Sequence, residues 1–110
     1  MEISEQVYSA AAARELGQLL EALDVLGDEV DVELSSDILT IEFPTRDRCV
    51  INSHRAARQI WMAANRSAWH FDYRPNGTWL ATKTGEELWS VISRIVSEKL
   101  GRSVQLARLN

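Results

Sequence analysis

Two runs of residues, Gln-Ile-Trp-Met-Ala at 59–63 and Trp-His-Phe-Asp-Tyr at 69–73, decide the fold of this chain. Both contain the aromatic and branched residues that favour β-strands, and a polar connector separates them. Side chains alternate between the two faces of a strand, so Ile60 and Met62 share one face and Trp61 lies on the other. We therefore expect two antiparallel strands, with Ile60 and Met62 packed against helices and Trp61 directed to solvent.

Four more β-rich runs extend this pattern outward along the chain. They lie at residues 31–34, 38–43, 49–52 and 79–80. Ser35-Ser36-Asp37 and Asn76-Gly77 have the composition of turns, and Pro44 ends the run before it. Short consecutive strands joined by such turns predict an antiparallel meander of about six strands.

A helix is predicted on the N-terminal side of the meander. From Ile3 to Leu23 apolar residues recur at helical spacing, Ser4 is a suitable N-cap, and Gly27 is a stop signal. The apolar stripe of this helix is expected to contain Val7, Ala11, Leu16, Leu19, Leu20 and Leu23.

A second helix is predicted to begin at a capping box, Thr84-Gly85-Glu86-Glu87, and to end at Gly101. Two helices at the chain ends, with one sheet between them, predict an α+β fold. We expect a two-layer α-β sandwich, with the N- and C-terminal helices packed on one face of an antiparallel sheet of about six strands. No linker or repeat divides residues 1–110, which are expected to form a single domain.

The composition is that of a globular protein, with 45% hydrophobic and 25% charged residues. No run approaches the roughly 18 apolar residues of a membrane span, so we expect no membrane partner. The stretch from Met1 to Ala13 is mildly acidic and lacks the basic start and apolar core of a signal peptide, which predicts the bacterial cytoplasm. The single cysteine, Cys49, lies in an apolar run and is expected to be a buried packing thiol.

The net charge of −4 conceals a strong asymmetry along the chain. Residues 1–45 contain eleven acidic residues and one basic residue, whereas residues 46–110 contain five acidic and eleven basic residues. The carboxylates of such an acidic block repel one another unless a bound cation or a basic partner neutralises them.

The acidic block suggests a surface for cations. Asp24, Asp28 and Glu29 are expected at the C-terminal end of the first helix, where the helix dipole already favours positive charge. Asp31 and Glu33 would continue the row on one face of the following strand. Carboxylates are hard ligands that suit Mg, Ca, Mn or iron, and an open row of them should bind metal weakly. The alternative is a solvated acidic face that aids solubility.

No catalytic motif accompanies this surface, and no catalytic residue is expected. The sequence has no Gly-rich phosphate loop, no GxSxG elbow and no HExxH. His54 is expected to be a solvated residue of a basic connector, and His70 a residue of a strand surface. Five arginines in residues 46–66, close to Trp61, suit a protein interface; single-stranded nucleic acid would suit them too, but the overall acidity argues against it.

Several stretches together resemble the bacterial branch of the frataxin family. They are Val50-Ile51-Asn52, the Gln-Ile-Trp run at 58–64, the His-Phe-Asp run at 69–73, the lone Trp79, the strand at 38–41 and the start of the second helix at 84–88. Their order and spacing match the family over nearly the whole chain. The fold of that family is the same α-β sandwich.

The resemblance implies an iron-binding protein that donates or senses iron and regulates iron–sulfur cluster assembly. It implies iron held weakly by surface carboxylates at Glu21, Asp24, Asp28, Glu29, Asp31 and Glu33. It also implies two partners, a cysteine desulfurase and the cluster scaffold protein, with the partner-binding positions Asn52, Gln59, Trp61 and His70. Val25 and Leu26 interrupt the acidic row, so weaker or fewer metal sites are expected than in some relatives.

Two alternatives stay open. Besides the iron-binding protein, one alternative is a metal-independent acidic adaptor, whose acidic face fits a basic partner. The other is a weak ferroxidase, although an open row of carboxylates offers poor convergence on two metals. We expect a non-enzymatic monomer, with metal-induced oligomers as the alternative assembly.

Overall fold

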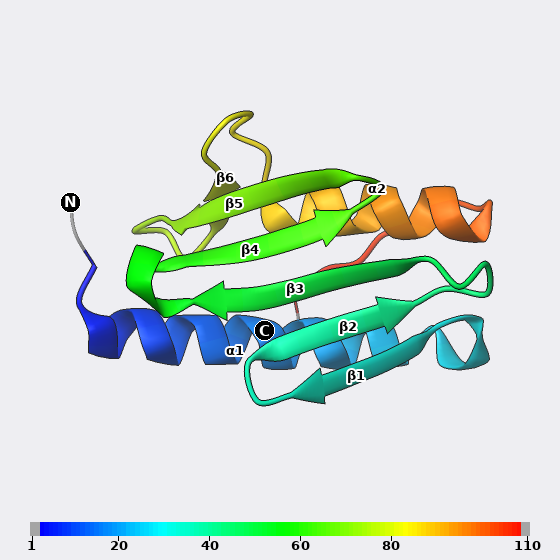
Figure 1. The fold of residues 1–110 in the computed structure, drawn as a ribbon, viewed down its shortest axis with the longest axis horizontal. Coiled ribbons are helices and arrows are strands. Elements are labelled where there is room, and N and C mark those ends of the chain that lie inside the picture. The colour runs from blue at the N-terminus through cyan, green and yellow to red at the C-terminus, as the bar shows by residue number, and fades with distance from the viewer. Residues whose placement is uncertain (1–2, 109–110) are drawn as a thin grey trace.

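The fold is described from a computed structural model, which covers residues 3–108 (Figure 1). The elements in chain order are α1 (Glu5–Asp24), η1 (Gly27–Glu29), β1 (Asp31–Ser35), β2 (Ile38–Glu42), β3 (Arg48–His54), η2 (Arg55–Ala57), β4 (Gln59–Ala64), β5 (Ser67–Tyr73), β6 (Trp79–Ala81) and α2 (Leu88–Leu100).

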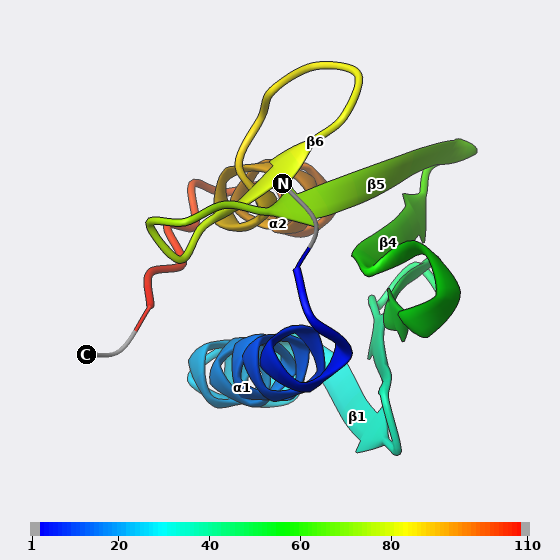
Figure 2. The same ribbon diagram turned by 90° about the vertical axis from the view of Figure 1, so that its left-hand side faces the viewer.

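The strands form one antiparallel sheet in the order β1-β2-β3-β4-β5-β6. Both helices cover the same face of this sheet and run side by side behind it (Figure 2). The opposite face, here called the open face, is free of helices. The predicted two-layer α-β sandwich is confirmed, and β1 lies at one edge of the sheet.

The start of α1 is as predicted, but its buried stripe is shifted. Ser4 is the N-cap, and its side chain accepts a hydrogen bond from the Val7 backbone N–H at 3.1 Å. The prediction that Val7 belongs to the stripe is wrong, because its side chain is 54% exposed. Tyr8 is buried instead and donates from its hydroxyl to the Gln59 carbonyl at 2.7 Å. Successive helical residues are about 100° apart, so a stripe centred on Tyr8 leaves Val7 outside.

The start of α2 lies three residues later than predicted, with Glu87 and not Thr84 at the N-cap position. The helix begins at Leu88, and Thr84 does not cap it. The Thr84 hydroxyl instead accepts from the Glu86 backbone N–H at 3.2 Å, a local turn in which Gly85 has a φ of +76°. Glu87 then forms a β-bridge with Leu80, which holds this segment extended against β6. The C-terminal stop is confirmed, since Gly101 is left-handed and its N–H bonds to the Ser97 carbonyl at 3.0 Å.

The core fills the space between the sheet and the two helices. Ile60 and Met62 are buried there, as their alternation predicted, together with the large ring of Trp79. Cys49 is also fully buried, and burial raises the pKa of its thiol to about 12. A thiol that stays protonated is a poor nucleophile, so the predicted packing role of Cys49 is confirmed.

The segment after α2 returns along the helices on the side away from the sheet (Figure 2). There Arg108 forms an ion pair with Glu15, a residue of α1 that is only 5% exposed. The Trp89 indole N–H also donates to Glu15 at 2.6 Å, and Arg108 contacts Glu87 at 2.9 Å. This charge cluster joins α1, α2 and the C-terminal segment. Glu15, a member of the acidic block, is therefore neutralised by an arginine of the same chain.

Candidate functional site: an acidic ridge and an aromatic stack

The six predicted metal-binding carboxylates lie along one side of the molecule and are here called the acidic ridge. They are Glu21 and Asp24 in the last turns of α1, Asp28 and Glu29 in η1, and Asp31 and Glu33 on β1. All are exposed except Glu29, which is half-buried. Because β1 is the edge strand, the ridge is open to solvent and to partners along its length.

One member of the ridge is already paired with a cation. The Arg102 Nε donates to Glu29 Oε1 at 3.0 Å, and Nη2 of the same guanidinium donates to Glu29 Oε2. These hydrogen bonds hold the pKa of Glu29 below its usual value. By contrast, no basic residue occupies the last turn of α1.

The ridge is a row of ligands and not a closed cage. Within residues 3–108, no three His, Cys, Asp or Glu side chains converge closely enough to hold a metal ion between them. A hard cation on such a row would have waters completing its coordination shell, which means weak binding. The assignment of the six carboxylates to metal stays a prediction.

Sequence reasoning missed one further carboxylate beside the ridge. Glu42 pairs directly opposite Asp31 in the β1–β2 ladder. With Asp28 and Glu29 it lines a hollow of about 390 Å³, whose rim also carries Arg46. Glu42 is 3.6 Å from the Arg48 guanidinium. The position of Glu42 follows from the register of β1 against β2. The alternation of polar and apolar residues in the runs at 31–34 and 38–43 could have indicated it.

The structure brings the four predicted partner-binding residues together on the open face. Asn52, Trp61 and His70 lie opposite one another on β3, β4 and β5. Gln59 lies two residues before Trp61 on the same face of β4. The partner-binding role of these residues stays a prediction, although their proximity is a property of the fold.

Trp61 is the centre of an aromatic stack, formed by His54, Trp61 and His70. The ring centroids of His54 and Trp61 are 3.7 Å apart, those of Trp61 and His70 are 4.1 Å apart, and the planes are within 11° of parallel. The prediction that His54 is a solvated connector residue is therefore wrong. Because the two imidazoles cover its faces, Trp61 is half-buried and presents mainly its edge to solvent.

Hydrogen bonds fix the orientation of the stack. The Trp61 indole N–H donates to Gln59 Oε1 at 2.8 Å, and Gln59 Nε2 donates to Asp72 Oδ1 at 2.9 Å. His54 Nδ1 accepts from the Ala57 backbone N–H at 3.3 Å, which caps η2. The Trp61 ring is thus held before any partner arrives, and this lowers the conformational entropy that docking would cost.

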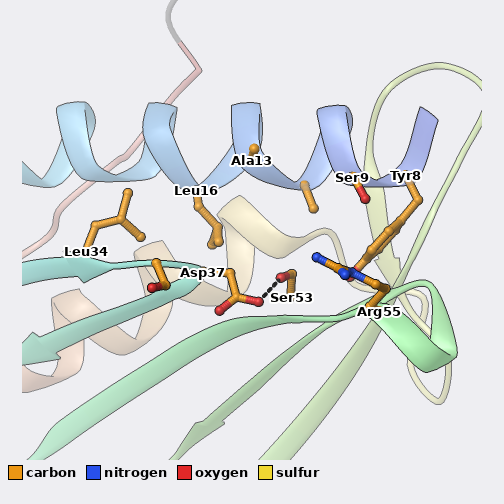
Figure 3. Close-up of a pocket in the computed structure, with 10 residues that line it drawn as sticks. Tyr8, Ser9, Ala13, Leu16, Leu34, Asp37, Ser53 and Arg55 are labelled. Carbon is orange, nitrogen blue, oxygen red and sulfur yellow. Dashed lines mark hydrogen bonds between the residues drawn. The ribbon is translucent and has the colours of Figure 1, made fainter. Parts of the chain in front are cut away.

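A separate cavity of about 510 Å³ lies between α1 and the ends of the first strands (Figure 3). Leu16 and Leu34 give it an apolar wall, and Arg55 and Asp37 lie at its polar side. Asp37 accepts a hydrogen bond from the Ser53 hydroxyl at 2.8 Å. None of the residues predicted to bind metal or a partner lines this cavity.

A membrane-spanning role finds no support in the helices. Among the residues that the structure describes, no helix has the length and apolar character needed to cross a bilayer.

Comparison with known proteins identifies the family. Residues 1–102 match the sequence model of the frataxin-like domain. The chain is 34% identical to the iron-sulfur cluster assembly protein CyaY of Ralstonia nicotianae, over 88% of each chain. It is 31% identical to CyaY of Vibrio vulnificus, over 84% of this chain and 88% of the relative.

Solved structures agree with this relationship. Frataxin from Psychromonas ingrahamii superimposes with a TM-score of 0.88 at 23% identity, over 96% of this chain and 100% of the other, and supports the fold. Trimeric frataxin from Saccharomyces cerevisiae, complexed with ferrous iron, gives a TM-score of 0.74 at 31% identity, over 84% and 87% of the two chains. This chain belongs to the frataxin family.

Proposed function

We propose that this protein takes part in iron–sulfur cluster assembly, carrying or sensing iron and binding the cysteine desulfurase and the scaffold protein. The observation that carries the proposal is the acidic ridge, a row of six carboxylates, five of them exposed, that runs from the end of α1 through η1 to the edge strand of a frataxin-family chain. The relatives named as cluster assembly proteins support the process.

Iron is proposed as cargo of the ridge. Carboxylate oxygens are suitable ligands for iron, and the hollow lined by Asp28, Asp31 and Glu42 gathers several of them. The yeast frataxin complexed with ferrous iron supports the choice of metal. The open geometry favours weak, exchangeable binding, which suits a protein that delivers or senses iron and does not store it.

The two surfaces are proposed to bind different partners. The ridge would dock on a basic surface of the desulfurase, since exposed charges of one sign govern encounter and orientation. The open face, with Asn52, Gln59, Trp61 and His70, would meet the scaffold, because a half-buried Trp with polar neighbours is a frequent interface hot spot.

The metal-independent adaptor is the second candidate, and the Glu29–Arg102 ion pair favours it, because part of the ridge is neutralised without metal. A ferroxidase is disfavoured, since paired metals need converging ligands and those are absent from the described part of the chain.

An anaerobic titration with Fe²⁺, followed in a two-dimensional NMR spectrum of the amides, separates iron carriage from the adaptor. We expect shifts or line broadening confined to residues 21–33 and to Glu42. The double variant Asp31→Lys/Glu33→Lys should lose them, whereas the exposed control Glu98→Lys on α2 should keep them. If millimolar Fe²⁺ leaves residues 21–33 unchanged, iron carriage is wrong and the adaptor remains.

A further inference from the structure

A hollow of about 370 Å³ lies beside the aromatic stack, between the start of β5 and the segment that follows β6. It is here called the β5–β6 hollow, and it is lined by Ser67, Ala68, Trp69, His70, Ala81, Thr82, Lys83 and Thr84. The lining offers hydroxyls, an ammonium group and an imidazole. None of these lining residues carries a carboxylate. Hydrogen-bond donors and positive charge in one concavity are the chemistry that recognises an anion.

The two carboxylates that follow the hollow in the same segment, Glu86 and Glu87, are already paired with arginines. Glu86 forms an ion pair with Arg94 on α2 and accepts from the Thr84 hydroxyl at 3.1 Å. The pKa of Glu86 is held below its usual value by the Arg94 contact first and the Thr84 hydrogen bond second. The Lys83 side chain is exposed and makes no hydrogen bond or ion pair within residues 3–108. Its charge is therefore available to a ligand.

His70 connects the hollow to the stack. Its ring stacks on Trp61, and its backbone carbonyl accepts from the Thr82 N–H at 2.9 Å, which fixes the segment after β6 beside it. The His70 side chain is exposed and makes no hydrogen bond to any residue in the described range. Its imidazole nitrogens can therefore bind a ligand or take up a proton without breaking an existing contact.

Two charged groups surround His70. Lys83 shares the hollow with it, and Asp72 lies two residues along β5 on the same face, where its carboxylate accepts from Gln59. Trp61 covers the face of the His70 ring that points to β4. His54, on the far side of Trp61, uses Nδ1 as an acceptor for Ala57, so protonation there would break the η2 cap. His54 is thus a positioning residue for Trp61, and His70 is the member of the stack whose side chain makes no hydrogen bond within residues 3–108.

We propose that the β5–β6 hollow accepts a carboxylate-bearing segment of the protein that docks on the open face, and that protonation of His70 tightens this contact. The proposal rests on the proposed function only in that a protein docks on this face. Histidine is the side chain that ordinarily changes charge between pH 5 and 8, so docking is expected to strengthen as pH falls through that range. A cation stacked on an indole face is also favourable, so a protonated His70 keeps its place on Trp61.

The test titrates the full chain with a capped hexaglutamate peptide in NMR, at pH 6.0 and pH 8.0 and at one ionic strength. We expect shifts at the Trp61 indole N–H and at the amides of residues 67–70 and 82–84, with affinity about threefold or more higher at pH 6.0. Inorganic phosphate serves as the small-anion arm. Phosphate that binds these residues as tightly as the peptide would overturn the assignment to a protein segment, and so would a peptide that shifts none of them at pH 6.0.

Matched variants make the test specific. Lys83→Ala is expected to weaken peptide binding about threefold, whereas Arg14→Ala, which removes an exposed positive charge from α1, should leave it unchanged. His70→Asn should retain the affinity measured at pH 8.0 and lose the difference between the two pH values. A pH difference that persists in His70→Asn, or equal effects of Lys83→Ala and Arg14→Ala, would overturn the inference. If the scaffold bound the open face equally well at both pH values, the inference would be overturned and the proposed function would stand. If the scaffold did not bind the open face at either pH, the scaffold-docking part of the proposed function would be wrong.

Discussion

Replacing Arg108 with alanine is expected to lower the free energy of unfolding by about 2–3 kcal/mol and the melting temperature by about 10 °C. The reason is the position of Glu15, whose side chain is only 6% exposed and depends on Arg108 for its ion pair. Without the guanidinium, the buried Glu15 carboxylate keeps, among residues 3–108, only the Trp89 indole N–H as a partner. The Arg108 side chain is 27% exposed, which places the expected loss below that of a fully buried pair.

Thermal and urea unfolding measure this loss, and Arg102→Ala provides the control. Arg102 pairs with Glu29 on the surface, where solvent screens the pair, so its loss is expected to destabilise the fold much less than the loss of Arg108. Adding Glu15→Gln to Arg108→Ala should recover part of the stability, because a neutral amide leaves no unpaired charge. If Arg108→Ala were no more destabilising than Arg102→Ala, the charge cluster would not hold the C-terminal segment.

Reversing Asp31 and Glu33 to lysine is expected to weaken binding to the cysteine desulfurase about 100-fold at low salt. Both side chains are exposed on the edge strand, so the double variant changes the charge of the ridge without touching the core. The change at Asp31 also places a cation opposite Glu42, which favours the β1–β2 pairing. Folding stability should therefore stay within about 1 kcal/mol of the parent chain.

Calorimetry or surface plasmon resonance at two salt concentrations measures this affinity. For the parent chain it should fall steeply as salt rises, because screening acts on exposed charges. The control Glu98→Lys changes an exposed carboxylate of α2 and should bind like the parent. Undiminished binding by Asp31→Lys/Glu33→Lys would exclude the ridge as the docking surface.

The strands could be predicted because their signals are local. Ile60 and Met62 alternate with Trp61, and burial of the first two is enough to fix the register of β4 against the helices. The start of α2 could not be predicted in the same way. A Thr-x-x-Glu pattern fits a capping box, but the bridge between Glu87 and Leu80 keeps the segment extended, and that contact depends on where β6 lies.

The acidic ridge and the open face could be predicted only in part, because some of their contacts depend on how distant segments of the chain pair. The acidic ridge is contiguous in sequence, so composition and strand alternation indicate it. The aromatic stack depends on the pairing of three strands. His54 could not be placed over Trp61 from the sequence, because it is the last residue of β3 and the η2 turn that it caps has no clear sequence signal. Glu15 and Arg108 are 93 positions apart, a distance at which a single sequence carries no information on pairing.

The most direct test of the proposed function is the rate of cluster formation by purified cysteine desulfurase and scaffold protein, with iron and cysteine supplied. An equimolar amount of this protein is expected to change the rate at least twofold. Asp31→Lys/Glu33→Lys is expected to leave the rate unchanged, while Glu98→Lys acts like the parent. A rate that is the same with and without the parent protein, at low salt and with Fe²⁺ present, would contradict the proposed role in cluster assembly.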